Sequence, residues 1–153
     1  MTTNTVILLA EDNPNDEELT LRALRKYKVS NEVIVVRDGQ EALDYLFGEG
    51  PHASRNMGVQ PQVVLLDINL PKVNGLEVLK RIRADKRTRT LPVVMLTSSA
   101  EERDRFAAYE NFANSYIRKP VDFDQFTEAV RELGLYWLVL NQPPPTPRTG
   151  NGR

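Results

Sequence analysis

The sequence contains no cysteine, and His52 is the only histidine among its 153 residues. Without cysteine, the chain cannot form a disulfide, use a thiolate as a nucleophile or bind zinc through thiolates. A single histidine excludes a metal site built from several histidines, and a Ser-His-Asp triad would have to use His52 itself. These two absences exclude several common classes of enzyme and metal site.

A charge excess of one sign and a long apolar run are also missing. Lys and Arg total 20, Asp and Glu total 21, and the formal net charge is -1. This balance gives no electrostatic reason to expect nucleic acid or an anionic membrane as a partner. No apolar run approaches the ~20 residues that span a bilayer, and the N-terminal stretch lacks the features of a signal peptide. We therefore expect a soluble, cytoplasmic protein that binds neither nucleic acid nor membrane.

Five short apolar runs predict β-strands. Most are rich in Val, Ile and Leu without polar alternation, which is typical of parallel strands covered on both faces. The runs are Val6–Ala10, Val33–Val36, Val63–Leu66, Val93–Leu96 and, more weakly, Ser115–Ile117. Helical patterns follow them over residues 16–27, 40–47, 75–84 and 101–112, and from near 122 to as far as 140. This alternation predicts an α/β fold with an open parallel sheet and helices on both sides.

The length suits one domain, which we expect over residues 1–141. Residues 47–61 are rich in Gly, Pro and polar residues and predict a surface loop. The Pro-rich end, residues 142–153, has nothing to bury and is predicted to be a disordered tail.

Polar residues stand at the carboxyl ends of four predicted strands. They are Glu11 and Asp12, Asp67 with Asn69 beyond it, Thr97 with Ser98, and Lys119 with Pro120. Parallel strands bring such residues to one edge of the sheet, where open sheets bind ligands. Carboxylates within ~4–6 Å repel one another unless a cation is present, and their oxygens suit Mg2+. With a lysine, such a cluster would bind a phosphoryl group, and a carboxylate can be the nucleophile of its transfer.

These residues resemble the receiver domain of two-component response regulators. The resemblance covers residues 6 to about 134 and rests on "EDN", "LLDINLP…NG", "LTSS" and "YIRKP", in that order at the ends of the strands. It implies a flavodoxin-like, doubly wound (βα)5 fold whose five-stranded sheet has the order 2-1-3-4-5. It also implies a signalling protein, not an enzyme, which catalyses only its own phosphorylation and dephosphorylation.

The resemblance gives the acidic residues their roles. Asp67 matches the aspartate that accepts a phosphoryl group from a histidine kinase. Asp12 matches a direct Mg2+ ligand, and Glu11 matches the acidic neighbour that holds the ion mostly through water. Asn69 stands where the family offers a backbone carbonyl to the same ion, with Asp67 itself as a further ligand.

The resemblance also assigns the residues that respond to the phosphoryl group. Thr97 matches the hydroxyl that moves to bond a phosphoryl oxygen, and Lys119 matches the lysine that pairs with the group. The bond from Lys119 to Pro120 is expected to be cis, which would direct the lysine toward the site. Tyr116 matches the aromatic switch that turns inward when Thr97 moves.

The loop over residues 48–60 and the ending "LYWLVLNQP" look like those of single-domain regulators partnered with bacterial and cyanobacterial phytochromes. This implies phosphotransfer from a bacteriophytochrome or a similar sensor kinase. No output domain is expected after residue 141, so the output would be the surface of the receiver itself. The alternatives are a chemotaxis-type receiver that binds a motor or another target, and an intermediate in a phosphorelay.

Two other classes share parts of this pattern. A phosphatase of the haloacid type also forms an aspartyl phosphate, but it usually needs a second aspartate where this sequence has Asn69. A flavodoxin-type flavin binder shares the fold but needs a hydroxyl-rich phosphate loop after the first strand. Glu11 and Asp12 stand at that position and would repel the phosphate. Turnover of a phosphate ester would favour the first class, and a yellow preparation the second.

The run Leu135–Leu140 continues the last predicted helix and is apolar nearly all round. Either it folds back onto its own subunit, or it is covered by a second copy. We expect a two-fold homodimer through helix four, strand five and helix five, with Trp137 as an anchor near its centre.

Overall fold

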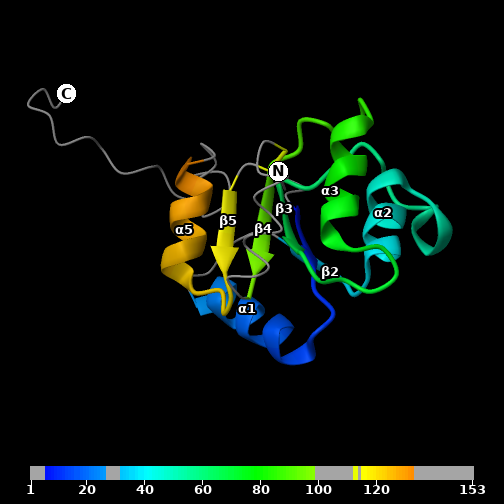
Figure 1. Ribbon diagram of the computed structural model, residues 1–153. Coiled ribbons are helices and arrows are strands. Elements are labelled where there is room, and N and C mark those ends of the chain that lie inside the picture. The colour runs from blue at the N-terminus through cyan, green and yellow to red at the C-terminus, as the bar shows by residue number, and fades with distance from the viewer. Residues whose placement is uncertain (1–5, 27–31, 99–111, 114, 133–153) are drawn as a thin grey trace, which may run out of the picture.

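Five parallel strands form one sheet in the computed structural model, which describes residues 6–26, 32–98, 112–113 and 115–132 (Figure 1). Their order is β2-β1-β3-β4-β5, so the predicted flavodoxin-like order is confirmed. The strands are β1 (Val6–Ala10), β2 (Glu32–Val36), β3 (Val63–Asp67), β4 (Val93–Thr97) and β5 (Ser115–Arg118). Each boundary agrees with the sequence prediction to within one residue, because burial on both faces marks a strand clearly.

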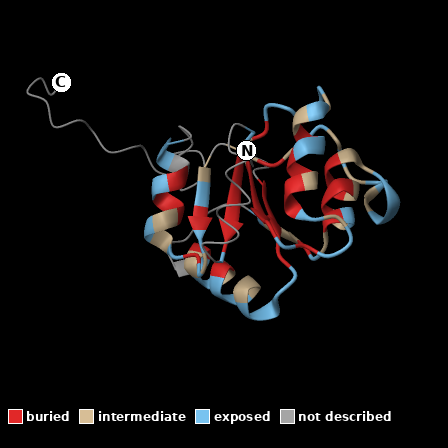
Figure 2. Ribbon diagram, in the orientation of Figure 1, coloured by how far each residue is buried: buried red, intermediate tan, exposed pale blue. Residues whose placement is uncertain are grey.

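Helices cover both faces of the sheet (Figure 1). They are α1 (Pro14–Lys26), α2 (Gly39–Phe47), α3 (Gly75–Ala84) and α5 (Phe123–Glu132). Successive strand residues point to opposite faces. Leu8 therefore packs in one core cluster with residues of α2 and α3, whereas Leu9 packs in a second cluster with residues of α1 and α5. Figure 2 shows the resulting layers, with the strands largely buried between helices whose outer sides are exposed.

Side-chain caps fix where the helices begin. The side-chain oxygen of Asn13 accepts hydrogen bonds from the backbone N–H groups of Asn15 and Asp16, at 2.8 and 3.0 Å. Pro14 is the first residue of α1, a position where its missing N–H costs nothing. The helix therefore begins earlier than its apolar pattern, from Asp16, had predicted. Asn74 caps α3 in the same way through the N–H of Glu77, at 3.0 Å.

Two close backbone approaches position the segment that follows β3. A Cβ atom on Gly75 would lie 2.1 Å from the carbonyl oxygen of Asp67, so only glycine fits where α3 begins. A Cβ on Gly39 would lie 1.7 Å from the carbonyl oxygen of Val73, so the start of α2 packs against the same segment. The start of α3 thus packs against the backbone of Asp67, and the start of α2 packs against the segment that follows it.

The loop before β3 is folded against α2. It contains a short 3-10 helix, η1 (Gly50–His52). The guanidinium carbon of Arg55 lies 4.1 Å from the ring centroid of Tyr45, and Arg55 donates hydrogen bonds to the carbonyls of Tyr45 and Val59. His52 is half-buried, with Nε2 3.3 Å from a carboxylate oxygen of Glu41. One arginine thus organises a segment whose composition predicts only a surface loop.

Three sequence predictions concern residues beyond those described. They are most of the helix over 101–112, the continuation of the last helix that includes Trp137, and the Pro-rich tail, 142–153. None of the helices in the described ranges combines the length and apolar character that a membrane span requires.

Candidate functional site

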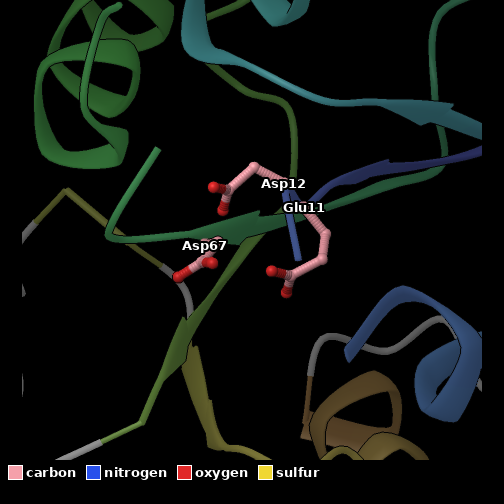
Figure 3. A group of neighbouring side chains, drawn as sticks. All are labelled: Glu11, Asp12 and Asp67. Carbon is pink, nitrogen blue, oxygen red and sulfur yellow. The ribbon is translucent and has the colours of Figure 1, made fainter. Parts of the chain in front are cut away.

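Three carboxylates meet at the carboxyl ends of β1 and β3 (Figure 3). Glu11 and Asp12 directly follow β1, and Asp67 is the last residue of β3. One oxygen from each lies within 4.8 Å of the others, so the group has the arrangement of a metal-binding cluster. Glu11 and Asp67 are buried, whereas Asp12 is exposed. The cluster lies at the switch point of the sheet, because β1 pairs with β2 on one side and with β3 on the other.

Lys119 follows β5 and reaches across β4 to the cluster. Its ammonium nitrogen lies 2.9 Å from Asp67 Oδ2, and 3.2 and 3.3 Å from the two carboxylate oxygens of Glu11. Burial by itself lowers the pKa of Lys119. Hydrogen bonds to Asp16 and Asp67 and the nearby negative charges raise the pKa by more than burial lowers it, so the net pKa lies above the usual value for lysine. Lys119 is therefore a largely buried group that carries its positive charge at neutral pH.

Glu11 is the carboxylate most affected by this crowding. Burial, together with a hydrogen bond and charge repulsion from Asp67, raises its pKa to about 8. The charge of Lys119 and the backbone N–H of Asn13, 3.2 Å away, oppose this rise and do not cancel it. In the absence of a cation, Glu11 holds a proton at neutral pH, and a divalent cation would compete with that proton.

Most of the remaining sequence-predicted residues lie on β4 and β5 or directly after β3 and β5. Thr97 is buried at the end of β4, and its carbonyl accepts the N–H of Lys119 at 2.7 Å. The N–H of Asn69 donates to Asp67 Oδ1 at 3.1 Å. The peptide bond between Lys119 and Pro120 is cis. Tyr116 lies on the edge strand β5, opposite Met95 of β4, and the residue is 40% exposed. Trp137 is not among the described residues.

Asp16 is a site residue that the sequence reasoning missed. Its Oδ2 lies 2.9 Å from the ammonium nitrogen of Lys119. An acidic residue in the first turn of a helix is ordinarily explained by the helix dipole, so Asp16 gave no separate signal. The Asn-Pro cap could have revealed it, because this cap starts the helix close enough to Glu11 for Asp16 to face the same site.

A match to a known protein family identifies the kind of domain that carries this site. The model described as "Response regulator receiver domain" matches residues 7–131. The chain is a response regulator receiver domain. This is a family of signalling proteins rather than of enzymes, as the motifs at the strand ends had predicted.

Several relatives resemble this receiver over nearly its whole length. The probable methanogenesis regulatory protein FilR2 of Methanothrix harundinacea is 42% identical over 91% of this chain and 87% of its own. The bacteriophytochrome response regulator RtBRR is 56% identical, with a TM-score of 0.83 over 94% of this chain and 86% of its own. AtBRR is 52% identical, with a TM-score of 0.84 over 92% of this chain and 100% of its own. The receiver is thus related to the phytochrome response regulators.

Three further structures concern the chemistry of such sites. The phosphorylated cyanobacterial phytochrome response regulator RcpA is 40% identical, with a TM-score of 0.70 over 89% of this chain and 95% of its own. The Mn(2+)-bound form of Rcp1 is 35% identical, with a TM-score of 0.69 over 88% and 94%. The receiver domain of the kinase PA1611 from Pseudomonas aeruginosa, with magnesium in its active-site cleft, is 28% identical, with a TM-score of 0.68 over 86% and 99%.

Proposed function

We propose that this receiver accepts a phosphoryl group on Asp67 from a histidine kinase and thereby switches a surface for a partner or a second copy. The observation that supports this most directly is the environment of Asp67. Its carboxylate ends a buried strand, contacts the ammonium of Lys119 at 2.9 Å, and lies beside Glu11 and Asp12. A strand buried on both faces holds a nucleophile more accurately than a loop does.

The donor set of the cluster suits Mg2+. Glu11, Asp12 and Asp67 would hold the ion, and the exposed side of Asp12 leaves room for the several water ligands that Mg2+ keeps. When bound, the ion neutralises charge on the oxygens of the incoming phosphoryl group. The fit rests on the donor set: three carboxylates so close together repel one another unless a cation is present, and a bound cation would relieve that repulsion. Burial first, and then a hydrogen bond and charge repulsion from Asp67, raise the pKa of Glu11. The Mn(2+)-bound structure of Rcp1 and the magnesium-bound structure of the PA1611 receiver support the same proposal by analogy.

Four residues have separate roles in the proposed phosphoryl transfer and in the response to it. A carboxylate oxygen of Asp67 attacks phosphorus, and the phosphorus–nitrogen bond of the phosphohistidine breaks. The imidazole nitrogen keeps the electron pair and takes a proton. Lys119, already 2.9 Å from Asp67, then pairs with an oxygen of the transferred group. Buried Thr97, on the adjacent strand, donates its hydroxyl to a second oxygen, and Tyr116 follows its movement from the exposed face of β5.

The kinase is a bacteriophytochrome or a similar sensor, and the encounter takes place in the cytoplasm. The likeness to RtBRR and AtBRR, two bacteriophytochrome response regulators, supports this choice. The functional unit is the receiver over residues 1–141, with a Pro-rich tail over 142–153. Its output surface is helix four, strand five and helix five, where Trp137 anchors a homodimer.

Phosphorylation with acetyl phosphate and Mg2+ tests the central step. Wild type is expected to acquire one phosphoryl group that is labile to base and to hydroxylamine, as an acyl phosphate is, and Asp67→Asn is expected to acquire none because the nucleophilic oxygen is lost. Asp38→Asn is a matched control, since Asp38 caps α2 and binds no site residue through its side chain. Equal labelling of wild type and Asp67→Asn would refute the assignment. Profiling against the histidine kinases of the source organism would then identify the donor.

A further inference from the structure

Asp16 is a fourth carboxylate at the site, and it is not one of the three that form the metal-binding cluster. Its Oδ2 lies 2.9 Å from the ammonium nitrogen of Lys119, the same distance as Asp67 Oδ2. Its side chain is 29% exposed, whereas the side chain of Lys119 is 9% exposed. Asp16 therefore contacts the lysine from the solvent side, while Glu11 and Asp67 contact it from the buried side.

The backbone holds Asp16 firmly in this position. Its N–H donates to the side chain of the capping residue Asn13 at 3.0 Å, and its carbonyl accepts the hydroxyl of Thr20 at 2.8 Å. Asp16 thus stands in a capped first turn, on a rigid element rather than a loop. The helix dipole accounts for an acid at this position, but it does not account for a direct contact with a lysine from the other end of the sequence.

The three contacts use the whole donor capacity of Lys119. An ammonium group has three N–H donors, and acceptor oxygens of three acidic side chains, Glu11, Asp16 and Asp67, lie within 3.3 Å of it. Once Asp67 carries a phosphoryl group, Asp16 remains a charged acceptor on the same nitrogen. Both carboxylates contact that nitrogen, so they lie within ~6 Å of each other, a range in which like charges repel appreciably.

We propose, on the basis of the proposed function, that Asp16 is a positioning residue that competes with the phosphoryl group for Lys119. It draws the ammonium toward α1 and adds a negative charge close to the incoming dianion. Asp16 thereby lowers the share of the receiver that is phosphorylated at a given supply of phosphodonor. Asp16 acts only through Lys119 and takes no part in the transfer itself.

Binding of beryllofluoride, a phosphoryl mimic, in the presence of Mg2+ tests this proposal without any turnover. Asp16→Asn is expected to bind beryllofluoride about threefold more tightly than wild type in calorimetric titrations, the size expected for a partly exposed ion pair. Its steady-state phosphorylation by limiting acetyl phosphate should rise in parallel. Asp16→Glu keeps the charge and should restore the wild-type affinity, and Asp16→Ser is a second neutral variant if Asp16→Asn fails to fold.

Glu18→Gln is the matched control. It removes one negative charge from the same helix, but Glu18 pairs with Arg22 and Arg25, each at 3.5 Å, rather than with Lys119. It should therefore leave the affinity for beryllofluoride unchanged. If Asp16→Asn and Asp16→Ser bind the mimic as wild type does, or more weakly, competition by Asp16 is refuted. If wild type itself neither binds the mimic nor becomes phosphorylated, the proposed function is what fails.

Discussion

Glu11 shows how a single residue can be costly to the fold and useful to the site. Its side chain is fully buried, beside Asp67 and the ammonium of Lys119. Its pKa of about 8 lies far above the ordinary value of 4.5. Between these two pH values the folded chain binds a proton at Glu11 that the unfolded chain has released. Folding therefore opposes the ionisation that metal binding requires.

We expect the free energy of unfolding in chelator to fall as the pH rises from 4.5 to about 8. The sign follows from the proton count, because the folded state holds one more proton than the unfolded state in this window. The raised pKa of Lys119 acts elsewhere, above pH 10.5, where its stabilising contribution would begin to be lost. Urea unfolding of wild type from pH 5 to pH 8 should show a loss of at least about 1 kcal/mol, one pKa unit being worth ~1.4 kcal/mol.

Glu11→Gln should remove most of this pH dependence, since the amide has the same shape and does not titrate. Glu18→Gln, on an exposed part of α1, should retain it. Parallel stability curves for wild type and Glu11→Gln would contradict the assignment of the shift to Glu11.

At the scale of elements, the close contact between the start of α3 and the end of β3 constrains the phosphoacceptor directly. A Cβ on Gly75 would come within 2.1 Å of the carbonyl oxygen of Asp67 and 2.9 Å of the Cα of Ile68. Both are backbone atoms, so a methyl group cannot be accommodated by turning a neighbouring side chain. The phosphoacceptor strand and the next helix would have to move apart.

Gly75→Ala is therefore expected to lower the free energy of unfolding by about 2 kcal/mol, in the range of overpacked cores, and to slow phosphorylation by acetyl phosphate. Denaturant titration and a labelling time course measure the two effects. Gly58→Ala is the control, because its Cβ would meet only the side-chain oxygen of Asn56, at 3.2 Å. A Gly75→Ala chain as stable and as reactive as wild type would show that α3 does not fix Asp67.

The elements also show which features the sequence could predict. Runs such as Val63–Leu66 are continuous because both faces are covered, so the strands were predictable. The meeting of Asp67, Glu11 and Lys119 at one edge of a parallel sheet was predictable with them, whereas the strand order followed from the resemblance to receiver domains. The folded arrangement of the loop over residues 48–60 was not predictable. It depends on contacts of the Arg55 side chain with Tyr45 and Val59, and such contacts leave no periodic pattern in the sequence. Asp16 was missed because an acid in a first helical turn already has an ordinary explanation.

At the scale of the whole molecule, the proposed homodimer gives the clearest prediction. Its anchor, Trp137, lies in an apolar run that one sheet face has no need to bury in full. In sedimentation experiments, the full chain should form dimers that beryllofluoride and Mg2+ strengthen. A chain ended after Gly134 should remain monomeric, and it keeps every residue of the family match, which ends at 131.

Asp67→Asn in the full chain is the control for the response to the mimic, which it should lack. A full chain that stays monomeric with and without the mimic would refute the dimer. A truncated chain that still dimerises would show that another surface is used.

The reach of Lys119 also has a consequence for biosynthesis. Its partner Glu11 lies 108 residues earlier in the chain, and β5, which delivers the lysine, is the last strand of the sheet. On the ribosome, β1 and β3 emerge well before β5 and can pair while the lysine is still absent. A nascent receiver thus has Asp67 in place but not yet the ammonium group of Lys119 that completes the site. The site is therefore complete only after the last strand has paired with β4.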